Sequence, residues 1–172
     1  LLKNYIKKYN EKPNDLETIK TVYTKTKGCA DSTLNVELLK KLNALAPNYT
    51  YATRLANIYV KNKQTDEAII LYQNALAIET DSIKKSDLYF YMAFMKYIKE
   101  DFPASRDFAK QAIELSGKNI RAYNLIATLY LSSGSLCGPG TGFQSQIVLW
   151  PAFDYFKKTI EIDSINNYLF LD

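Results

Sequence analysis

The sequence predicts an all-α protein, a right-handed α-solenoid of stacked helix-turn-helix repeats. Three observations support this fold class. Glycine (6) and proline (5) are scarce among the 172 residues, which favours long helices over sheets with many tight turns. Apolar residues recur at helical spacing. Small residues return with a period of 34 to 37 residues, which indicates an internal repeat.

The clearest copy of the repeat occupies 51–81 and contains two helices separated by the polar break KNKQTD. Asp66 is positioned to cap the second helix, because its carboxylate can accept hydrogen bonds from free backbone N–H groups. Small side chains at the helix crossing let the two backbones approach closely. The residues predicted for the inner faces are Ala52, Leu55, Ala56 and Tyr59, then Ala68, Tyr72 and Ala75.

Two further copies follow the same plan. The copy at 88–117 is offset by 37 residues, and a third begins 34 residues beyond it. We expect Pro151 at the first position of the last predicted helix, where its missing N–H costs nothing. The inner residues predicted here are Tyr89, Met92, Ala93, Ser105, Ala109 and Ala112, then Tyr123, Ile126, Ala127, Tyr130, Ala152, Phe156 and Thr159.

The predicted organisation is one array over 1–172. Its parts are 1–13, the second helix of a truncated repeat; 14–47, a degenerate repeat; 49–82, 86–119 and 120–164, three fuller repeats; and 165–172, a tail. Because the pattern begins in the middle of a repeat, we expect the chain to be part of something longer. The tail is open to three interpretations: a next helix, a partner-contacting segment or a frayed terminus.

The third repeat carries an enlarged turn at 132–151. The two small residues that flank the turn are 12 apart in the earlier copies and 25 apart here, so 13 extra residues protrude at one edge. Two interpretations are open. The segment is a binding loop that presents Phe143 and Trp150, or, as we favour, a structural flap that packs Trp150 inside.

The repeat pattern resembles the tetratricopeptide repeat. In this chain a small residue in the first helix is followed by Ala-x-x-x-Tyr-x-x-Ala in the second, although the family's early tryptophan is replaced by Ala52, Tyr89 or Tyr123. The stretch LSSGSLCG…VLWPAFDYFKKTIEID is similar to extracytoplasmic tetratricopeptide proteins of Bacteroidetes-type bacteria. The residues that carry this similarity are Cys137, Gly138, Trp150, Ala152, Asp154 and Lys158.

This resemblance implies an envelope location, in the periplasm or at the outer membrane, and a scaffold role without enzymatic activity; a cytoplasmic location is the alternative. It also bears on Cys29 and Cys137, which lie in turns on the same predicted edge. The roots of these turns are about 25–30 Å apart by helix packing, a gap that the enlarged turn is long enough to close. The pair therefore forms one disulfide or remains as two thiols.

The resemblance further implies a concave groove, lined by the first helix of each repeat, that holds a peptide or a partner helix. The expected groove residues are Lys20, Asn57, Lys61, Phe90, Phe94, Tyr97, Arg121 and Asn124. The three aromatic residues are either anchors for an apolar side chain or are buried by neighbouring elements. Only Asn57 and Arg121 match the family's carboxylate clamp, so capture of a C-terminal carboxylate is not expected.

Composition argues against several other functions. The chain has no histidine, which removes the usual general base and histidine-bound metals, and its two cysteines cannot form a four-cysteine zinc site. GPGTG lacks the lysine and spacing of a phosphate loop. The net charge of +4 is dispersed, and no apolar run reaches the length of a membrane span.

We therefore expect no enzyme, no cofactor, no metal, no nucleic-acid partner and no membrane span. The expected function is a non-enzymatic scaffold that binds a protein or peptide, within a multi-protein complex. The alternative is a structural subunit permanently embedded in a larger envelope complex.

Overall fold

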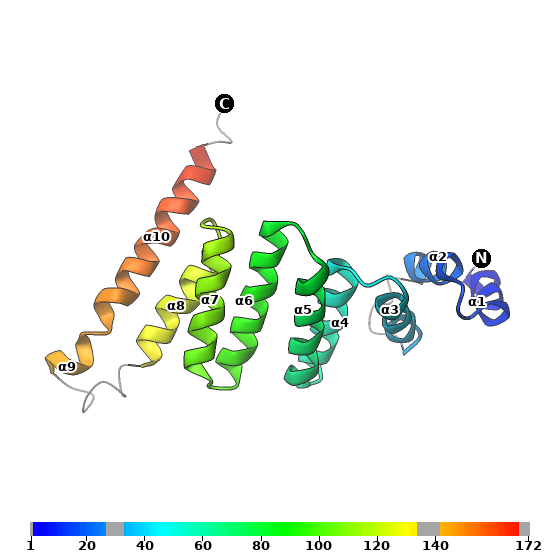
Figure 1. Cartoon of the computed structure of the whole chain (residues 1–172), viewed down its shortest axis with the longest axis horizontal. Coiled ribbons are helices and arrows are strands. Elements are labelled where there is room, and N and C mark those ends of the chain that lie inside the picture. The colour runs from blue at the N-terminus through cyan, green and yellow to red at the C-terminus, as the bar shows by residue number, and fades with distance from the viewer. Residues whose placement is uncertain (1, 27–32, 134–141, 169–172) are drawn as a thin grey trace. The chain divides into compact units, whose positions relative to one another are not determined.

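The computed structural model describes residues 2–26, 33–133 and 142–168, and all regular structure in them is helical (Figure 1). The helices are α1 (Leu2–Glu11), α2 (Leu16–Thr26), α3 (Thr33–Leu45), α4 (Tyr49–Lys61), α5 (Thr65–Ile78), α6 (Ser82–Ile98), α7 (Phe102–Leu115), α8 (Ile120–Ser132), α9 (Phe143–Gln146) and α10 (Leu149–Tyr168). This confirms the all-α prediction. Cys29 and Cys137 lie outside the described residues, so their pairing stays a prediction.

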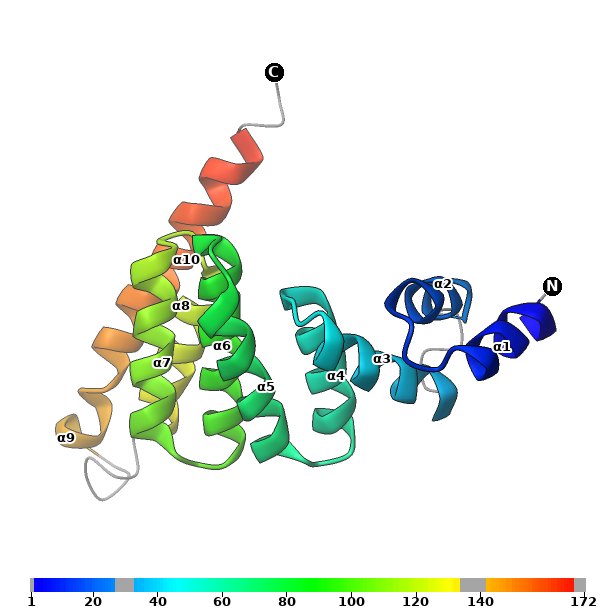
Figure 2. The same ribbon diagram turned by 45° about the vertical axis from the view of Figure 1, so that its right-hand side comes forward.

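The chain divides into two compact units, unit 1 (Leu1–Glu79) and unit 2 (Thr80–Asp172). In unit 1 each helix packs on the next one along the chain, from α1 to α5. In unit 2 α6 packs on α7, α7 on α8 and α8 on α10, while α8 also contacts α6 (Figure 2). Each unit is thus a stack of helical hairpins.

Unit 1 has its own hydrophobic core between α2, α3 and α4, in which Ile19, Leu38 and Leu42 are fully buried. A polar contact also ties α2 to α3. The Asn35 amide donates to the Thr26 carbonyl at 2.5 Å, and the Thr26 hydroxyl donates to Asn35 Oδ1 at 2.6 Å. These buried groups satisfy one another, which removes the cost of leaving them unpaired.

The predicted inner faces are confirmed. Small residues at the crossings are almost inaccessible, and Ser105 adds a bond by donating its hydroxyl to the Ala93 carbonyl at 2.8 Å. Apart from Tyr72, the aromatic members of the set are half-buried, as is Thr159. The fully buried members are Ala52, Leu55, Ala56, Ala68, Tyr72, Ala75, Met92, Ala93, Ser105, Ala109, Ala112, Ile126, Ala127 and Ala152.

The turn between α4 and α5 and the turn between α6 and α7 share one backbone motif. Lys63 and Glu100 have φ of 61° and 59°, in the left-handed region. The N–H of Gln64 donates to the Tyr59 carbonyl at 2.8 Å, and that of Asp101 donates to the Lys96 carbonyl at 3.0 Å. This is the bonding of a Schellman motif, which closes a helix end through its own backbone.

The prediction that Asp66 caps α5 is wrong. The N-cap is Gln64, because the Schellman turn ends there and helical geometry resumes at Thr65. Asp66 lies in the first turn, where a negative charge still interacts favourably with the helix dipole. α6 begins at Ser82, because the Asp81 carboxylate accepts from the N–H groups of Ile83 and Lys84 at 2.8 and 3.3 Å.

The last helix also differs from its prediction at both ends. α10 begins at Leu149 instead of Pro151, so the proline is its third residue. Proline is tolerated there because the first-turn N–H groups have no partner within a helix. At the other end α10 continues to Tyr168, so residues 165–168 extend this helix.

Candidate partner-binding face

The expected groove residues fall into both units. In unit 1, Asn57 and Lys61 project from one exposed face of α4, and the Asn57 amide oxygen accepts from the Tyr72 hydroxyl at 3.4 Å. Lys20 on α2 pairs with Glu17 at 2.9 Å. In unit 2, Phe90, Phe94 and Tyr97 lie on α6, and Arg121 and Asn124 on α8. The site described below is the unit 2 group.

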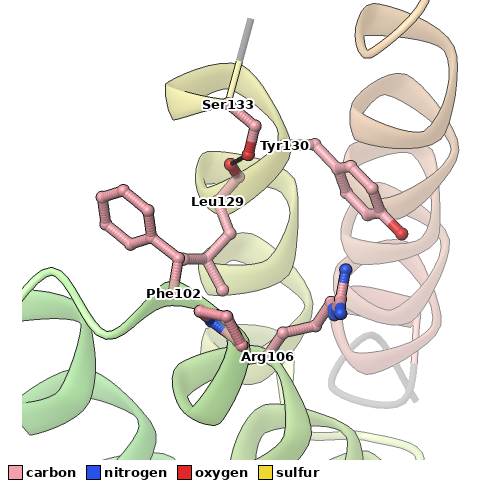
Figure 3. Close-up of a pocket in the computed structure, with 6 residues that line it drawn as sticks. Phe102, Arg106, Leu129, Tyr130 and Ser133 are labelled. Atoms are coloured by element: carbon pink, nitrogen blue, oxygen red, sulfur yellow. Dashed lines mark hydrogen bonds between the residues drawn. The ribbon is translucent and has the colours of Figure 1, made fainter. Parts of the chain in front are cut away.

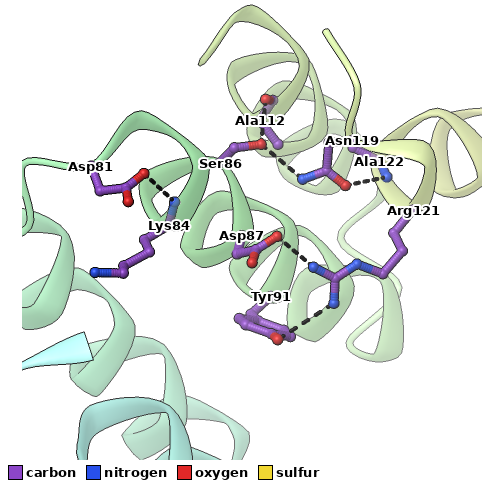
Figure 4. A network of polar contacts seen from close by, with 9 residues as sticks. All are labelled: Asp81, Lys84, Ser86, Asp87, Tyr91, Ala112, Asn119, Arg121 and Ala122. Atoms are coloured by element: carbon purple, nitrogen blue, oxygen red, sulfur yellow. Dashed lines mark hydrogen bonds and ion pairs between the residues drawn. The ribbon is translucent and has the colours of Figure 1, made fainter. Parts of the chain in front are cut away.

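A buried polar network fixes the start of α6 against α7 and α8 (Figure 4). The Ser86 hydroxyl donates to the Ala112 carbonyl at 2.7 Å and accepts from the Asn119 amide at 2.8 Å. Asn119 also caps α8, since its side-chain oxygen accepts from Ala122 N–H at 3.2 Å. Ser86 is fully buried and Asn119 is 8% exposed. The network therefore sets the register of α8 along α6.

Arg121 lies two residues after Asn119, the N-cap of α8, and its side chain is held over α6. Its guanidinium forms an ion pair with Asp87 and donates to the Tyr91 hydroxyl at 3.4 Å (Figure 4). It also lies 4.7 Å from the ring centroid of Phe90. Burial opposes its charge, but the bond to Tyr91 and the charge of Asp87 together raise the pKa of Arg121 above its usual value.

The aromatic residues of α6 form a continuous row. The rings of Phe90 and Phe94 stack with centroids 6.3 Å apart, Phe94 and Tyr97 repeat this spacing, and Tyr97 contacts Phe102 at 6.0 Å. Phe90 and Tyr97 are half-buried against the unit 2 core that includes Leu125. Phe94 is 40% exposed.

Both interpretations of these aromatics therefore apply, each to different residues. Phe90 and Tyr97 serve the packing of unit 2, and Phe94 offers ring surface to solvent. We call Asp87, Phe90, Tyr91, Phe94, Tyr97 and Arg121 the groove face. Asn124 is exposed one turn beyond Arg121 on the same helix. Aromatic surface beside a guanidinium can receive an apolar side chain together with a hydrogen-bond acceptor.

Tyr91 is a member of this face that sequence reasoning missed. Its hydroxyl accepts a hydrogen bond from Arg121 at 3.4 Å. Leu125, four residues after Arg121 in α8, is 6% exposed and belongs to the core. Arg121 follows Asp87 by 34 positions, which is one repeat period. This spacing between opposite charges is the signal in the sequence that could have predicted their pairing.

The two candidate residues of the enlarged turn, Phe143 and Trp150, are exposed, whereas we expected Trp150 to be packed inside. The interpretation of 132–151 as a flap that packs Trp150 inside is wrong for that residue, because Trp150 is 72% exposed, as is Phe143. Ala152, two residues further along α10, is buried. Residues 134–141 of the enlarged turn lie outside the described part of the chain.

Two kinds of feature are absent from the described part of the chain. No group of three or more His, Cys, Asp or Glu side chains gathers there as a metal site. The described helices also include none with the length and apolar character needed to cross a bilayer.

The hairpins, their small-residue crossings and the groove face define an α-solenoid of the tetratricopeptide type. A crystal structure of MamA is similar to it, with a TM-score of 0.75 and 20% identity over 97% of this chain and 89% of that one. MamA 41-end from Desulfovibrio magneticus RS-1 has a TM-score of 0.68 and 15% identity over 95% and 84%.

A monomeric mutant of IFIT1, solved with the capped RNA m7Gppp-AAAA, is similar with a TM-score of 0.59 and 15% identity. The match covers 92% of this chain and 37% of the IFIT1 chain. Neither the protein-family models nor the curated proteins give a match to the sequence. At these identities the likeness concerns the fold.

Proposed function

We propose that this protein is a non-enzymatic interaction scaffold whose groove face binds a peptide or a partner helix. One observation carries the proposal: Phe94 is exposed in the middle of a stacked aromatic row whose first ring, Phe90, contacts an arginine already held in place. An exposed aromatic with rigid neighbours loses little conformational freedom when a ligand covers it. Such residues contribute most of the binding free energy at protein interfaces.

The ion pair with Asp87 restricts what the ligand offers to Arg121. Because Asp87 already neutralises much of the guanidinium charge, a ligand carboxylate would compete with it and gain little. A backbone or side-chain carbonyl can accept from Arg121 without displacing Asp87. The ligand is therefore an apolar side chain on Phe94 followed by a neutral acceptor, which agrees with the expectation that a terminal carboxylate is not captured.

The test is a selection of displayed random peptides on the purified protein, followed by dissociation constants for the peptides obtained. Phe94→Ala should weaken binding by about tenfold or more, as loss of an interface anchor does. Ile83→Ala is the matched control, because Ile83 is an exposed apolar residue of the same helix outside the groove face. Equal affinities for wild type and Phe94→Ala would rule out this face.

Asp87→Asn separates the two kinds of ligand. Freed from its carboxylate, Arg121 should bind acidic peptides more tightly than in the wild type, whereas peptides that present a carbonyl should change little. A wild-type preference for free C-terminal carboxylates would contradict the proposed chemistry. Salt-dependent binding of RNA or DNA at the groove face would contradict the expected absence of a nucleic-acid partner.

We also propose an extracytoplasmic location and a Cys29–Cys137 disulfide, on the basis of the sequence resemblance. A disulfide of this kind requires an oxidising compartment. The test is alkylation of the denatured, unreduced chain from its native source, followed by intact-mass measurement. Cysteines that take label only after reduction, in a monomer, support both proposals, whereas immediate labelling of both contradicts the disulfide.

The alternative function, a permanent subunit of a larger complex, has one observation in its favour. Phe143, Trp150, Phe153 and Ile160 are each at least 66% exposed near the last helix. A permanent subunit should aggregate when produced without its neighbours, whereas a dissociable scaffold should remain monomeric in sedimentation experiments.

A further inference from the structure

Unit 2 ends in an apolar surface that lies apart from the groove face. Leu131 of α8 and Leu149, Trp150, Phe153 and Ile160 of α10 are 46%, 49%, 72%, 69% and 66% exposed. We call these five residues the end face. Two open hollows follow it along α10, the first lined by Leu131 and Trp150 among others, the second by Phe153 and Ile160. Soluble proteins rarely leave so much contiguous apolar surface uncovered.

The repeat shows what the equivalent surface of the preceding hairpin does. Ser105 of α7 corresponds to Ala152 of α10 at an offset of 47 residues, and the first helices, α6 and α8, correspond at an offset of 34. By these offsets, Tyr97 corresponds to Leu131, Phe102 to Leu149, Pro103 to Trp150, Arg106 to Phe153 and Ile113 to Ile160.

In the preceding hairpin α8 covers part of this surface, although Pro103 and Arg106 remain exposed. Tyr97, Phe102 and Ile113 are half-buried and pack on a core to which α8 contributes Leu125, Ile126 and Leu129. Phe102, Pro103 and Arg106 also line a hollow with Leu129, Tyr130 and Ser133 of α8 (Figure 3). The equivalent residues of α10 are at least as apolar as those of α7. Within the described residues, however, no helix lies over them.

We infer that the end face is a docking site for an amphipathic helix of a partner protein, in the place that α8 takes on α7. The contacting face of the partner's helix would carry aliphatic residues at the spacing of Leu125, Ile126 and Leu129, followed by an aromatic residue like Tyr130. Lys157 and Glu161 border the second hollow. They supply a polar rim that orients the helix without burying a charge.

The course of α10 favours a helix supplied by another polypeptide. In the preceding hairpin α7 ends at Leu115 and α8 begins at Ile120, so the chain turns back at once. The residue equivalent to Leu115 is Ile162, but α10 continues as a helix to Tyr168. Residues 163–168 thus continue the helix past the end face and do not turn back over it.

The chain provides both a probe and a reporter for the test. The probe is a synthetic copy of residues 119–133, made helical by a side-chain bridge between positions 124 and 128, away from its apolar face. Trp150 is the single tryptophan of the protein and lies on the end face, 72% exposed. Its fluorescence should shift to shorter wavelength as the peptide excludes water. Anisotropy of the labelled peptide gives the dissociation constant independently.

We expect saturable binding that weakens by about tenfold or more in Phe153→Glu and in Ile160→Glu, since a charge would be buried under the helix. Ile83→Glu, at a comparably exposed position of α6, should bind as the wild type does. A peptide with Leu125→Glu and Leu129→Glu should not bind. Circular dichroism melts of the full-length variants check that each remains folded.

Three results would overturn the inference. The first is the absence of binding up to about 1 mM peptide, and the second is binding that Phe153→Glu leaves intact. The third is a dimer in sedimentation equilibrium that Phe153→Glu dissociates, because the end face would then be covered by a second copy of this chain.

Discussion

At the scale of single residues, Asn119 has the most consequences for the site. It joins three helices by donating to Ser86, whose hydroxyl bonds Ala112, and it caps the helix that carries Arg121. Its removal leaves a buried acceptor on Ser86 and loses a helix cap at the same time. The geometry of the groove face thus depends on a residue that no ligand touches.

We predict that Asn119→Ala lowers the free energy of unfolding by about 2 kcal/mol, combining a lost cap with an unsatisfied buried group. Urea denaturation measures this change. Asn124→Ala is the control, because Asn124 is exposed in the same helix and its loss should cost less than about 0.5 kcal/mol. Equal effects of the two substitutions would mean that the buried network contributes nothing.

Asp101 gives a prediction about pH. The hydrogen bond from Lys96 lowers the pKa of Asp101 below its ordinary 3.8, against the opposing effect of burial, and the bond from Ala104 N–H adds to the lowering. A carboxylate whose folded pKa is depressed stabilises the protein above its unfolded pKa, and this contribution is lost as pH falls through the folded pKa.

Wild type should therefore be more stable than Asp101→Asn at about pH 6, and the difference should shrink towards about pH 3. Urea midpoints across this range test the sign. A difference that grows on acidification would show that the charge of Asp101 does not stabilise the fold.

At the scale of elements, the two turns with left-handed residues are places where a substitution can raise the free energy of unfolding. Lys63 and Glu100 adopt positive φ, which costs a residue with a Cβ more than it costs glycine. Lys63→Gly and Glu100→Gly should each raise the free energy of unfolding by about 0.5–1 kcal/mol. Lys63→Ala is the matched control, since alanine keeps the Cβ, and it should show no gain. A loss of stability in both glycine variants would mean that chain entropy outweighs the relief.

These turns also show how far sequence reasoning reaches. The helices and their inner faces were predictable, because small residues such as Ala56 and Ala93 recur wherever two backbones cross. The start of α5 was not, because a Schellman motif closes α4 through backbone bonds that need no glycine at Lys63. Asp66, the residue with the best capping chemistry, therefore lies two residues after the N-cap, Gln64.

The site was less predictable than the fold, for a related reason. Local spacing identifies an apolar helix face but not which of two faces is covered. In α10 both faces are apolar, and only the packing on α8 shows that Ala152 is buried while Phe153 is exposed. The same holds for α6, where Phe90 and Phe94 differ in exposure because the core reaches one ring and not the other.

At the scale of the whole molecule, the two units have cores that share no residue. The core of unit 1 runs from Tyr9 to Leu55, and one core cluster of unit 2 includes Ala93 and Ile126. In helical repeats, stability is approximately a sum of local contributions. A cavity in one core should therefore destabilise mainly its own unit.

We predict that Leu42→Ala, which empties a fully buried position of unit 1, costs about 2–5 kcal/mol there. Amide hydrogen exchange should accelerate in α2, α3 and α4 and stay close to wild type in α8. Ile126→Ala should give the reciprocal pattern. Acceleration of equal size in both units after either substitution would mean that the chain unfolds as one cooperative block.

Helix α8 contributes to both surfaces of unit 2, with Arg121 on the groove face and Leu131 on the end face. Ten residues of helix separate them, a rise of about 15 Å. Ligands bound at both faces would thus be held together at an effective concentration in the millimolar range, far above what most free proteins reach. A single helix would then suffice to bring two otherwise weak partners into reach of each other.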